Sequence, residues 1–346
     1  MTKKILVTGG MGYIGSHTVV ELLQHNYEVV IADNLCNSNA GVLDNIELIT
    51  KKRPAFYAID VCNKALLTDL FQQEKKVDAV IHFAAHKAVA ESVQQPLKYF
   101  RNNMDSLLTL LECMLEAGCS NIVFSSSATV YGDPDVLPVN ENTPFKKALS
   151  AYGSTKQMGE EVLEKTAAAE NIQVIALRYF NPAGAHPSAL IGELPLGTPN
   201  NLMPFITQTA IGKIKQLTVY GNDYDTPDGS CIRDYIHVVD LAKAHVKSCE
   251  RMIENNMDTA YEVFNIGTGV GLSVLELIHS FENENNLQLN YVIGPRRAGD
   301  AAAVYADVSK ANTVLQWKAD KNISDMVKDA WRWQSKLPAV AAQEER

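Results

Sequence analysis

The stretch Thr8–Gly15, TGGMGYIG, follows a short apolar run near the N-terminus and opens a segment with helical spacing. Gly10, Gly12 and Gly15 satisfy the pattern G-x-G-x-x-G, and Gly9 extends it to G-x-x-G-x-x-G. Glycines at such a turn let backbone N–H groups approach a pyrophosphate at the N-terminus of the following helix. Because the strand, turn and helix stand in the required order, they predict a dinucleotide-binding βαβ unit. The alternative is a glycine-rich turn that is only structural.

Short apolar runs alternate with segments of helical periodicity through residues 1–180. Several of these runs are almost continuously apolar, which is typical of parallel strands covered on both faces. The alternation favours a doubly wound parallel sheet, and therefore an α/β fold. The predicted strands are Lys4–Thr8, Glu28–Ala32, Phe56–Ala58, Val77–Phe83, Asn121–Ser125 and Gln173–Tyr179.

The pattern changes after residue 180. The segment 181–202 is rich in proline and glycine, and 221–234 is a second polar loop. Long loops in compact domains are often functional. We therefore expect a cofactor domain over 1–180 and a smaller α/β substrate-binding domain over 181–346, with Ala260–Gly267 packing back onto the first.

Composition excludes several classes of protein. The chain has 346 residues, of which 46% are hydrophobic, so it can bury a sizeable core. Its formal net charge of −9 disfavours a nucleic-acid partner, because an acidic surface repels phosphate backbones. We expect neither a membrane span nor a secretory signal, since no apolar run approaches the required length of about 18 residues. The six cysteines are scattered without a C-x-x-C pair, which indicates reduced thiols and a cytoplasmic location.

Several residues after the predicted strands suit a dinucleotide. Asp33 ends the second strand, where a carboxylate can accept hydrogen bonds from an adenosine ribose and would repel a 2′-phosphate, so NAD is favoured over NADP. Capping of the following segment is the alternative role for Asp33. Asp60-Val61 follows the third strand, and Phe83-Ala84-Ala85 ends the fourth, where ligands of open α/β sheets bind.

His82 and His86 have the spacing i, i+4 that some metal sites use. However, His82 falls in a strand pattern, and no glutamate stands between the two as in H-E-x-x-H. We therefore predict no metal site.

A catalytic group is indicated after the fifth strand. Ser125-Ser126-Ser127 ends that strand, and Tyr152 is the only one of the 13 tyrosines with a lysine, Lys156, four residues later. On a helix this spacing puts both side chains on one face. A nearby ammonium and the positive nicotinamide of NAD⁺ would lower the pKa of the phenol, so that Tyr152 could take a proton from a sugar hydroxyl. A packing tyrosine beside a surface lysine is the alternative.

Together these features resemble the extended short-chain dehydrogenase/reductase family, and within it most closely the UDP-hexose 4-epimerases. The resemblance runs through nearly the whole chain. The matching stretches are Val7–Gly15, Asp33–Ser38, Ile81–Val93, Phe124–Gly132, Ala151–Lys156, Leu177–His186, Asn200–Pro204, Arg233–Asp240 and Arg296–Asp300.

The resemblance implies a Rossmann-type fold, bound NAD, and interconversion of UDP-glucose and UDP-galactose by transient oxidation at C4, as in galactose metabolism. It implies that Ser127, Tyr152 and Lys156 are catalytic, with Tyr152 as general base. The residues that would line NAD are Gly9, Gly12, Tyr13, Ile14, Gly15, Asp33, Asn34, Leu35, Cys36, Asn37, Ser38, Asp60, Val61, Phe83, Ala84, Ala85, Lys87, Asn102, Ser125, Tyr152, Lys156 and Phe180. Those that would bind the UDP-sugar are Lys87, Ser127, Tyr152, Asn181, Asn201, Leu202, Thr218, Val219, Tyr220, Arg233, Arg297, Asp300 and Val304.

Arg233 and Arg297 suit a diphosphate, because guanidinium groups bind phosphate through two hydrogen bonds. Either arginine alone is as readily a surface ion-pair partner. The family is commonly homodimeric through helices of the first domain. The heptad-like run Leu107–Leu115 permits this, and core packing explains it equally well.

The residues after Ser127 distinguish between related reactions. The related 4,6-dehydratases carry an Asp-Glu pair at this point, whereas this chain has Ala128 and Thr129, which cannot move protons at neutral pH. A net-redox dehydrogenase or another nucleotide-sugar epimerase of the same fold, and a catalytically silent NAD-binding protein, remain as alternatives.

Val304 lies where some of these epimerases carry tyrosine. The smaller side chain would leave room for a 2-acetamido group, so we expect UDP-GlcNAc and UDP-GalNAc as further substrates. The alternative is that Val304 only fills the core.

Overall fold

The computed structural model of the chain describes residues 2–297 and 301–337. Its largest element is a seven-stranded sheet with the order β10-β6-β5-β4-β1-β2-β3, in which every neighbouring pair is parallel. This confirms the predicted doubly wound α/β fold. The strands of this sheet are β1 (Lys4–Thr8), β2 (Glu28–Ala32), β3 (Ala55–Tyr57), β4 (Ala79–His82), β5 (Asn121–Ser127), β6 (Gln173–Tyr179) and β10 (Tyr261–Ile266).

Helices cover both faces of the sheet, and this explains the continuously apolar strands. In β1, Ile5 and Val7 pack with the helices of one face while Leu6 packs with those of the other, and all three are fully buried. Successive side chains of a strand point to opposite faces, so a strand between two helical layers needs apolar residues at every position. The first layer contains α1 (Tyr13–Gln24), α2 (Gly41–Thr50), α8 (Val238–Ile253) and α10 (Ser309–Thr313), and the second contains α3 (Lys64–Glu74), α5 (Pro96–Ala117) and α6 (Ala151–Ala169).

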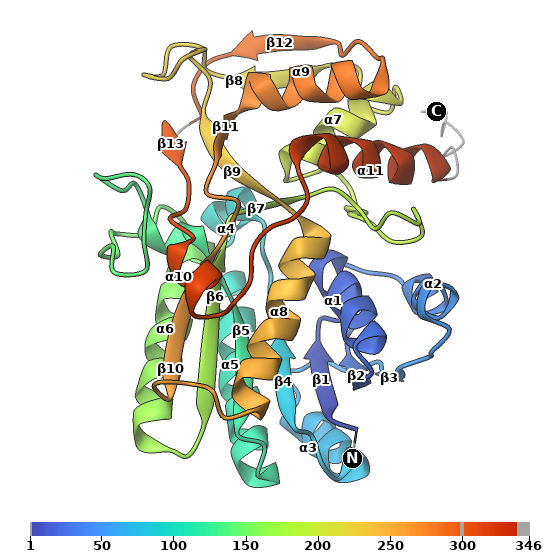
Figure 1. Cartoon of the computed structure of the whole chain (residues 1–346), viewed down its shortest axis with the longest axis vertical. Coiled ribbons are helices and arrows are strands. Elements are labelled where there is room, and N and C mark those ends of the chain that lie inside the picture. Colours follow the sequence, from blue (N-terminus) through green and yellow to red (C-terminus); the bar gives the residue numbers. More distant parts are fainter. Residues whose placement is uncertain (1, 298–300, 338–346) are drawn as a thin grey trace.

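Two smaller sheets lie beyond the carboxyl edge of the large one (Figure 1). At the centre of the first is β9 (Ile232–His237), which pairs in parallel with β7 (Asn181–Ala183) and β13 (Ala303–Val304) and antiparallel with β11 (Gly271–Ser273). The second pairs β8 (Leu217–Tyr220) with β12 (Tyr291–Gly294). The helices α7 (Leu202–Ala210), α9 (Val274–Asn285) and α11 (Ile323–Lys336) form an apolar core with these strands.

The short elements α4 (Val89–Gln94) and η1 (Ala128–Tyr131) follow β4 and β5. They connect the carboxyl edge of the sheet to the helices that return to its amino edge. None of the described helices combines the length and the apolar character that crossing a membrane requires.

Candidate active site

The predicted site residues come from loops at one edge of the large sheet. Because all seven strands are parallel, their carboxyl ends lie at the same edge. The glycine turn follows β1, Phe83 follows β4, Ser127 ends β5 and Phe180 follows β6. The first smaller sheet begins directly beyond this edge, since β7 starts at Asn181. The edge therefore lies between the two parts of the fold (Figure 1).

The glycine turn is tightly packed. Gly9 has φ +70°, and a Cβ there would lie 2.9 Å from the backbone nitrogen of Ala84. A Cβ at Gly15 would overlap the carbonyl oxygen of Gly9, whereas a Cβ at Gly12 would approach only that oxygen, at 3.3 Å. Gly12 is the N-cap of α1, and no side chain among the described residues caps this helix end. A helix N-terminus without a side-chain cap fits the pyrophosphate of a dinucleotide.

Asp33 organises the loop that follows β2. Its Oδ2 accepts a hydrogen bond from the backbone N–H of Met11 at 3.0 Å, and its Oδ1 accepts from the backbone N–H of Leu35 at 2.8 Å and the hydroxyl of Ser38 at 3.0 Å. The capping role considered from the sequence is therefore real. A carboxylate has about four acceptor positions, so these three contacts leave one for a ribose hydroxyl.

The predicted catalytic side chains come together at the start of α6. The hydroxyl of Ser150 accepts a hydrogen bond from the backbone N–H of Gly153 at 3.1 Å, which fixes the first turn of the helix. Tyr152 and Lys156 are buried on the face that packs on β5. The ammonium of Lys156 donates to the carbonyl oxygen of Ser125 at 2.6 Å and lies 5.7 Å from the centre of the Tyr152 ring.

The expected lowering of the Tyr152 pKa does not appear in the protein by itself. Burial raises the pKa of Tyr152 from 10 to about 12, and a hydrogen bond with Ser127 lowers it only in part. Burial also lowers the pKa of Lys156 to about 8, although the nearby Glu160 acts in the opposite direction. The dominant cause for both groups is burial, and the Lys156 ammonium is already engaged with the Ser125 carbonyl.

Asn103 joins these segments and was missed from the sequence. Its side chain accepts a hydrogen bond from the backbone N–H of His86 at 2.8 Å and donates to the His86 carbonyl at 3.0 Å and the Thr155 hydroxyl at 3.1 Å. It therefore ties the loop after β4 to the helix that carries Lys156. The signal was an asparagine pair, Asn102-Asn103, inside a helix, where asparagine is intrinsically unfavourable.

Three of the predicted substrate residues lie on β9 or on its neighbouring strands, and others lie in α7 and β8. Arg233 of β9 is the register partner of Val304 in β13, and Asn181 of β7 pairs with Tyr235. Asn201 is the N-cap residue of α7, directly before Leu202. Thr218, Val219 and Tyr220 lie in β8, and Tyr220 is 49% exposed.

The guanidinium of Arg233 is held by backbone oxygens. It donates to the carbonyls of Ile232 at 2.8 Å and Ala301 at 2.9 Å. Arg297 is exposed, and Asp300 lies outside the described residues.

Two predicted residues meet on a third that was not predicted. Lys87 and Asn201 both contact the carboxylate of Glu193, at 2.9 Å and 2.6 Å. Glu193 lies in the irregular loop before α7, where no periodic pattern singles out one residue. Its contacts link the loop after β4 to the second part of the fold.

Three buried histidines make the free energy of unfolding depend on pH. Burial lowers the pKa of His17 and His82 to about 3, and that of His245 to about 4. The unfolded chain, with a histidine pKa near 6.5, therefore binds more protons below pH 6.5 than the native protein does. We expect the free energy of unfolding to fall as the pH drops from 7 to 5, by about 1.4 kcal/mol per pH unit for each histidine once the pH is well below 6.5.

Urea denaturation at several pH values checks this expectation. His17 donates from Nδ1 to the Tyr13 carbonyl at 2.7 Å, because that oxygen can only accept, and asparagine can donate in its place. Substitution His17→Asn should reduce the slope of the unfolding free energy against pH by the contribution of one proton. The control His25→Asn, at an exposed position, should leave that slope unchanged. An equal slope in all three proteins would contradict the prediction.

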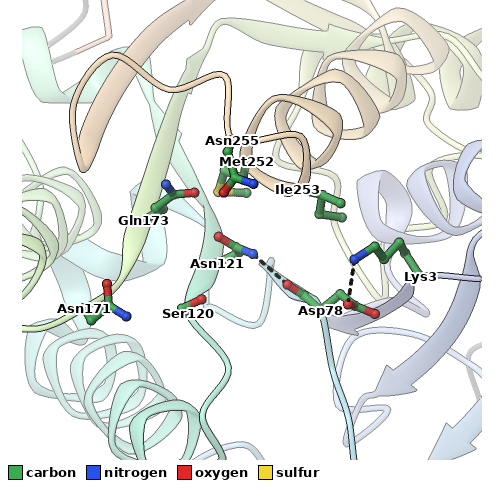
Figure 2. A pocket seen from close by; sticks show the side chains of 9 residues that line it. All are labelled: Lys3, Asp78, Ser120, Asn121, Asn171, Gln173, Met252, Ile253 and Asn255. Atoms are coloured by element: carbon green, nitrogen blue, oxygen red, sulfur yellow. Dashed lines mark hydrogen bonds and ion pairs between the residues drawn. The ribbon is translucent and has the colours of Figure 1, made fainter. Parts of the chain in front are cut away.

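A polar depression of about 240 Å³ lies at the opposite, amino edge of the sheet (Figure 2). It is lined by residues at the starts of strands, including Lys3, Asp78 and Asn121. Lys3 pairs with Asp78 at 3.3 Å, and the Asn121 amide donates to the Asp78 carbonyl at 2.8 Å. The catalytic side chains are not among its lining residues.

In the part of the chain that the structure describes, no group of three or more His, Cys, Asp or Glu side chains could hold a metal ion.

Comparison with known proteins identifies close relatives. The model of the GDP-mannose 4,6 dehydratase family matches residues 6–330. The UDP-glucose 4-epimerase of Haemophilus influenzae is 50% identical over 335 residues, which is 96% of this chain and 98% of the relative. The crystal structure of the Stenotrophomonas maltophila UDP-glucose 4-epimerase, with bound NAD and formylated UDP-arabinopyranose, is 47% identical, with a TM-score of 0.93 over 96% of this chain and 98% of that one. The Bifidobacterium longum enzyme in complex with NAD⁺ and UDP is 46% identical, with a TM-score of 0.92 over 97% and 99%.

Proposed function

The chain belongs to the UDP-glucose 4-epimerases of the extended short-chain dehydrogenase/reductase family, and from this premise we propose the role of each site residue. It is an NAD-dependent isomerase that interconverts UDP-glucose and UDP-galactose. The observation that carries the proposed roles is the burial of Ser127, Tyr152 and Lys156 at the same sheet edge as the glycine turn.

We propose that NAD lies across this edge, with its pyrophosphate at the α1 N-terminus and its adenosine ribose on Asp33. The α1 N-terminus at Gly12, which no described side chain caps, and the remaining acceptor position of Asp33 support this placement. When bound, NAD accepts the C4 hydrogen of the sugar as hydride and returns it. The chain's own residues hold the sugar and manage the proton of its 4-hydroxyl group.

In the proposed mechanism Tyr152 takes the proton from the 4-hydroxyl and later gives it back. The Ser127 hydroxyl holds the same sugar oxygen. The positive charge of Lys156, whose ammonium lies 5.7 Å from the centre of the Tyr152 ring, supports the phenolate. Because burial, only partly offset by the hydrogen bond with Ser127, raises the pKa of Tyr152 to about 12, the base needs the positive charge of bound NAD⁺ to lower this pKa toward neutral pH.

The matching family model is named for a dehydratase, whereas the relatives described above are named as epimerases. Dehydration needs a further acid and base beside the sugar, and the residues after Ser127 are Ala128 and Thr129. Neither can exchange a proton at neutral pH. Epimerisation needs only Tyr152 to remove and return one proton. The residues after Ser127 therefore agree with the reaction for which the relatives are named.

We expect the purified protein to convert UDP-galactose into UDP-glucose without added NAD, and to release NAD when it is denatured. The sugar is oxidised and reduced in one cycle, so no cofactor is consumed. A coupled assay for UDP-glucose, with chromatography of the released nucleotide, measures both. A net-redox dehydrogenase would stop without added NAD, and a silent binding protein would release NAD but show no turnover.

We propose that residues 181–346 supply the UDP-sugar cap and that residues 1–180 hold the cofactor. Support comes from β7, β9 and β13, which bring Asn181, Arg233 and Val304 into one sheet. Arg233 is the proposed diphosphate ligand, and its backbone contacts hold the guanidinium in place before substrate arrives. Asp300 keeps its proposed role as a substrate ligand.

We further propose that Val304 admits 2-acetamido sugars. Val304 is half-buried beside Arg233 and packs on the cluster that contains Phe180. Substitution Val304→Tyr should lower kcat/KM for UDP-GlcNAc and UDP-GalNAc by roughly tenfold or more, because a filled pocket excludes the larger group. Activity on UDP-glucose should change little, and Val270→Tyr, at a 62% exposed position, serves as the control. Unchanged activity on the acetamido sugars would reject the idea.

We propose a homodimer formed through α5 and α6. Leu97, Leu108 and Leu115 on α5 and Met158 on α6 are exposed apolar side chains, with Leu97 81% exposed. Exposed apolar patches on one face are typical of protein interfaces. Sedimentation of Leu108→Lys beside the parent protein tests this.

We also propose a cytoplasmic location, which is supported by six cysteines that are all free.

A further inference from the structure

Glu193 holds two proposed substrate ligands through one oxygen atom. Its Oε1 accepts from the Lys87 ammonium at 2.9 Å and from the Asn201 amide at 2.6 Å. Lys87 follows β4 and Asn201 precedes α7, so the contacts come from both parts of the fold. Asn201 is the N-cap of α7, its side-chain oxygen makes no cap bond, and its NH2 group donates to Glu193.

The carboxylate of Glu193 is largely removed from solvent. Its side chain is 11% exposed, and Oε2 is buried with no hydrogen-bond partner among the described residues. Its backbone is fixed, since the Trp333 indole donates to the Glu193 carbonyl at 3.1 Å and the same indole packs against Gly192. A buried carboxylate oxygen without a donor is unfavourable. Because this burial is unfavourable, other contacts must hold the carboxylate in place, namely the packing of Trp333 and the ion pair with Lys87.

The charge of Glu193 opposes the binding of an anion. A carboxylate 2.9 Å from the Lys87 ammonium cancels much of the positive potential that would attract a nucleotide diphosphate or the hydroxyls of its sugar. Lys87 is 43% exposed and can turn toward a ligand, whereas Glu193 is held. A ligand that contacts Lys87 must therefore compete with Glu193.

We propose that Glu193 is an internal competitor of the nucleotide sugar, and that substrate binding exchanges the Lys87–Glu193 ion pair for a contact between Lys87 and the substrate. This rests on the proposed function, in which Lys87 is a substrate ligand. Glu193 would then be a positioning residue that keeps Lys87 and Asn201 ordered in the free enzyme and weakens ground-state binding, which assists product release.

The test is the substitution Glu193→Gln, which keeps the shape and the acceptor oxygen but removes the charge. We expect the Kd for UDP and UDP-glucose, measured by calorimetry on the NAD-loaded protein, to fall by roughly threefold to tenfold. The KM should fall with the Kd, whereas kcat should not rise. A residue with only a structural role would leave the Kd unchanged or raise it, and either result would overturn the proposal.

A second arm asks whether the effect runs through Lys87. In a Lys87→Met background, Glu193→Gln should no longer tighten UDP binding, and tightening that persists would also overturn the proposal. Glu250→Gln, which removes the partner of Lys247 on the surface, should leave the Kd unchanged. If Glu193→Gln does not fold, Glu193→Asp tests the same point, because its shorter side chain draws the charge away from Lys87. Loss of UDP binding or turnover by the parent protein would instead reject the proposed function.

Discussion

Substitution Tyr152→Phe should lower kcat for UDP-galactose by about 10²- to 10⁴-fold, which is the usual contribution of a positioned general base. The ring stays buried on α6 and keeps its packing, so only the proton-transferring hydroxyl is lost. The amount of NAD released on denaturation should not change. Initial rates in the coupled assay measure the effect.

The matched control is Tyr57→Phe. The Tyr57 hydroxyl donates to Glu74 at 2.7 Å and lies on β3, an edge strand that β4, β1 and β2 separate from β5, so its removal should leave kcat within twofold of the parent value. Full activity of Tyr152→Phe would remove the general-base assignment. A loss in Tyr152→Phe accompanied by loss of bound NAD would point to cofactor binding instead.

The second large effect concerns Arg178, which pairs with Glu160 inside the protein. Arg178 is 5% exposed and Glu160 is 2% exposed, and the guanidinium approaches both carboxylate oxygens, with the shortest contact at 2.7 Å. The substitution Arg178→Met fills most of the space but leaves the Glu160 charge buried without its partner. We expect the free energy of unfolding to fall by about 3–5 kcal/mol.

Urea denaturation at pH 7.5 measures this loss. Arg53→Met is the control, because Arg53 also pairs with two carboxylates, Asp44 and Glu47, but at an exposed position on the surface. Its unfolding midpoint should match that of the parent. Equal midpoints for Arg178→Met and Arg53→Met would show that the buried pair adds nothing to stability.

The sheet could be predicted from the sequence because burial on both faces leaves a continuous apolar signal. The bounds of β1, β2 and β6 are those expected, whereas β4 is shorter than the predicted run Val77–Phe83. The glycine turn was equally visible, since its backbone conformation demands particular residues at fixed spacing. Both are local properties of the chain.

The pairings between distant segments could not be predicted. Arg178 stands in an apolar strand, but nothing in the sequence says that its partner is Glu160 on α6. Asn103 and Glu193 likewise act through residues far away in the chain. The orientation of Lys156 toward the Ser125 carbonyl likewise depends on how α6 packs on β5, and the raised pKa of Tyr152 depends on the burial that this packing produces. Such properties depend on three-dimensional packing, which periodicity does not encode.

The central claim is that the C4 hydrogen leaves the sugar, is held within the site and returns to the same carbon. Conversion of UDP-galactose carrying deuterium at C4, in ordinary water, tests it directly by mass spectrometry of the UDP-glucose formed. We predict that essentially all of the deuterium stays at C4. Loss of the deuterium to solvent would contradict the account, because it would mean that C4 exchanges a proton with water and that transient oxidation is not the route.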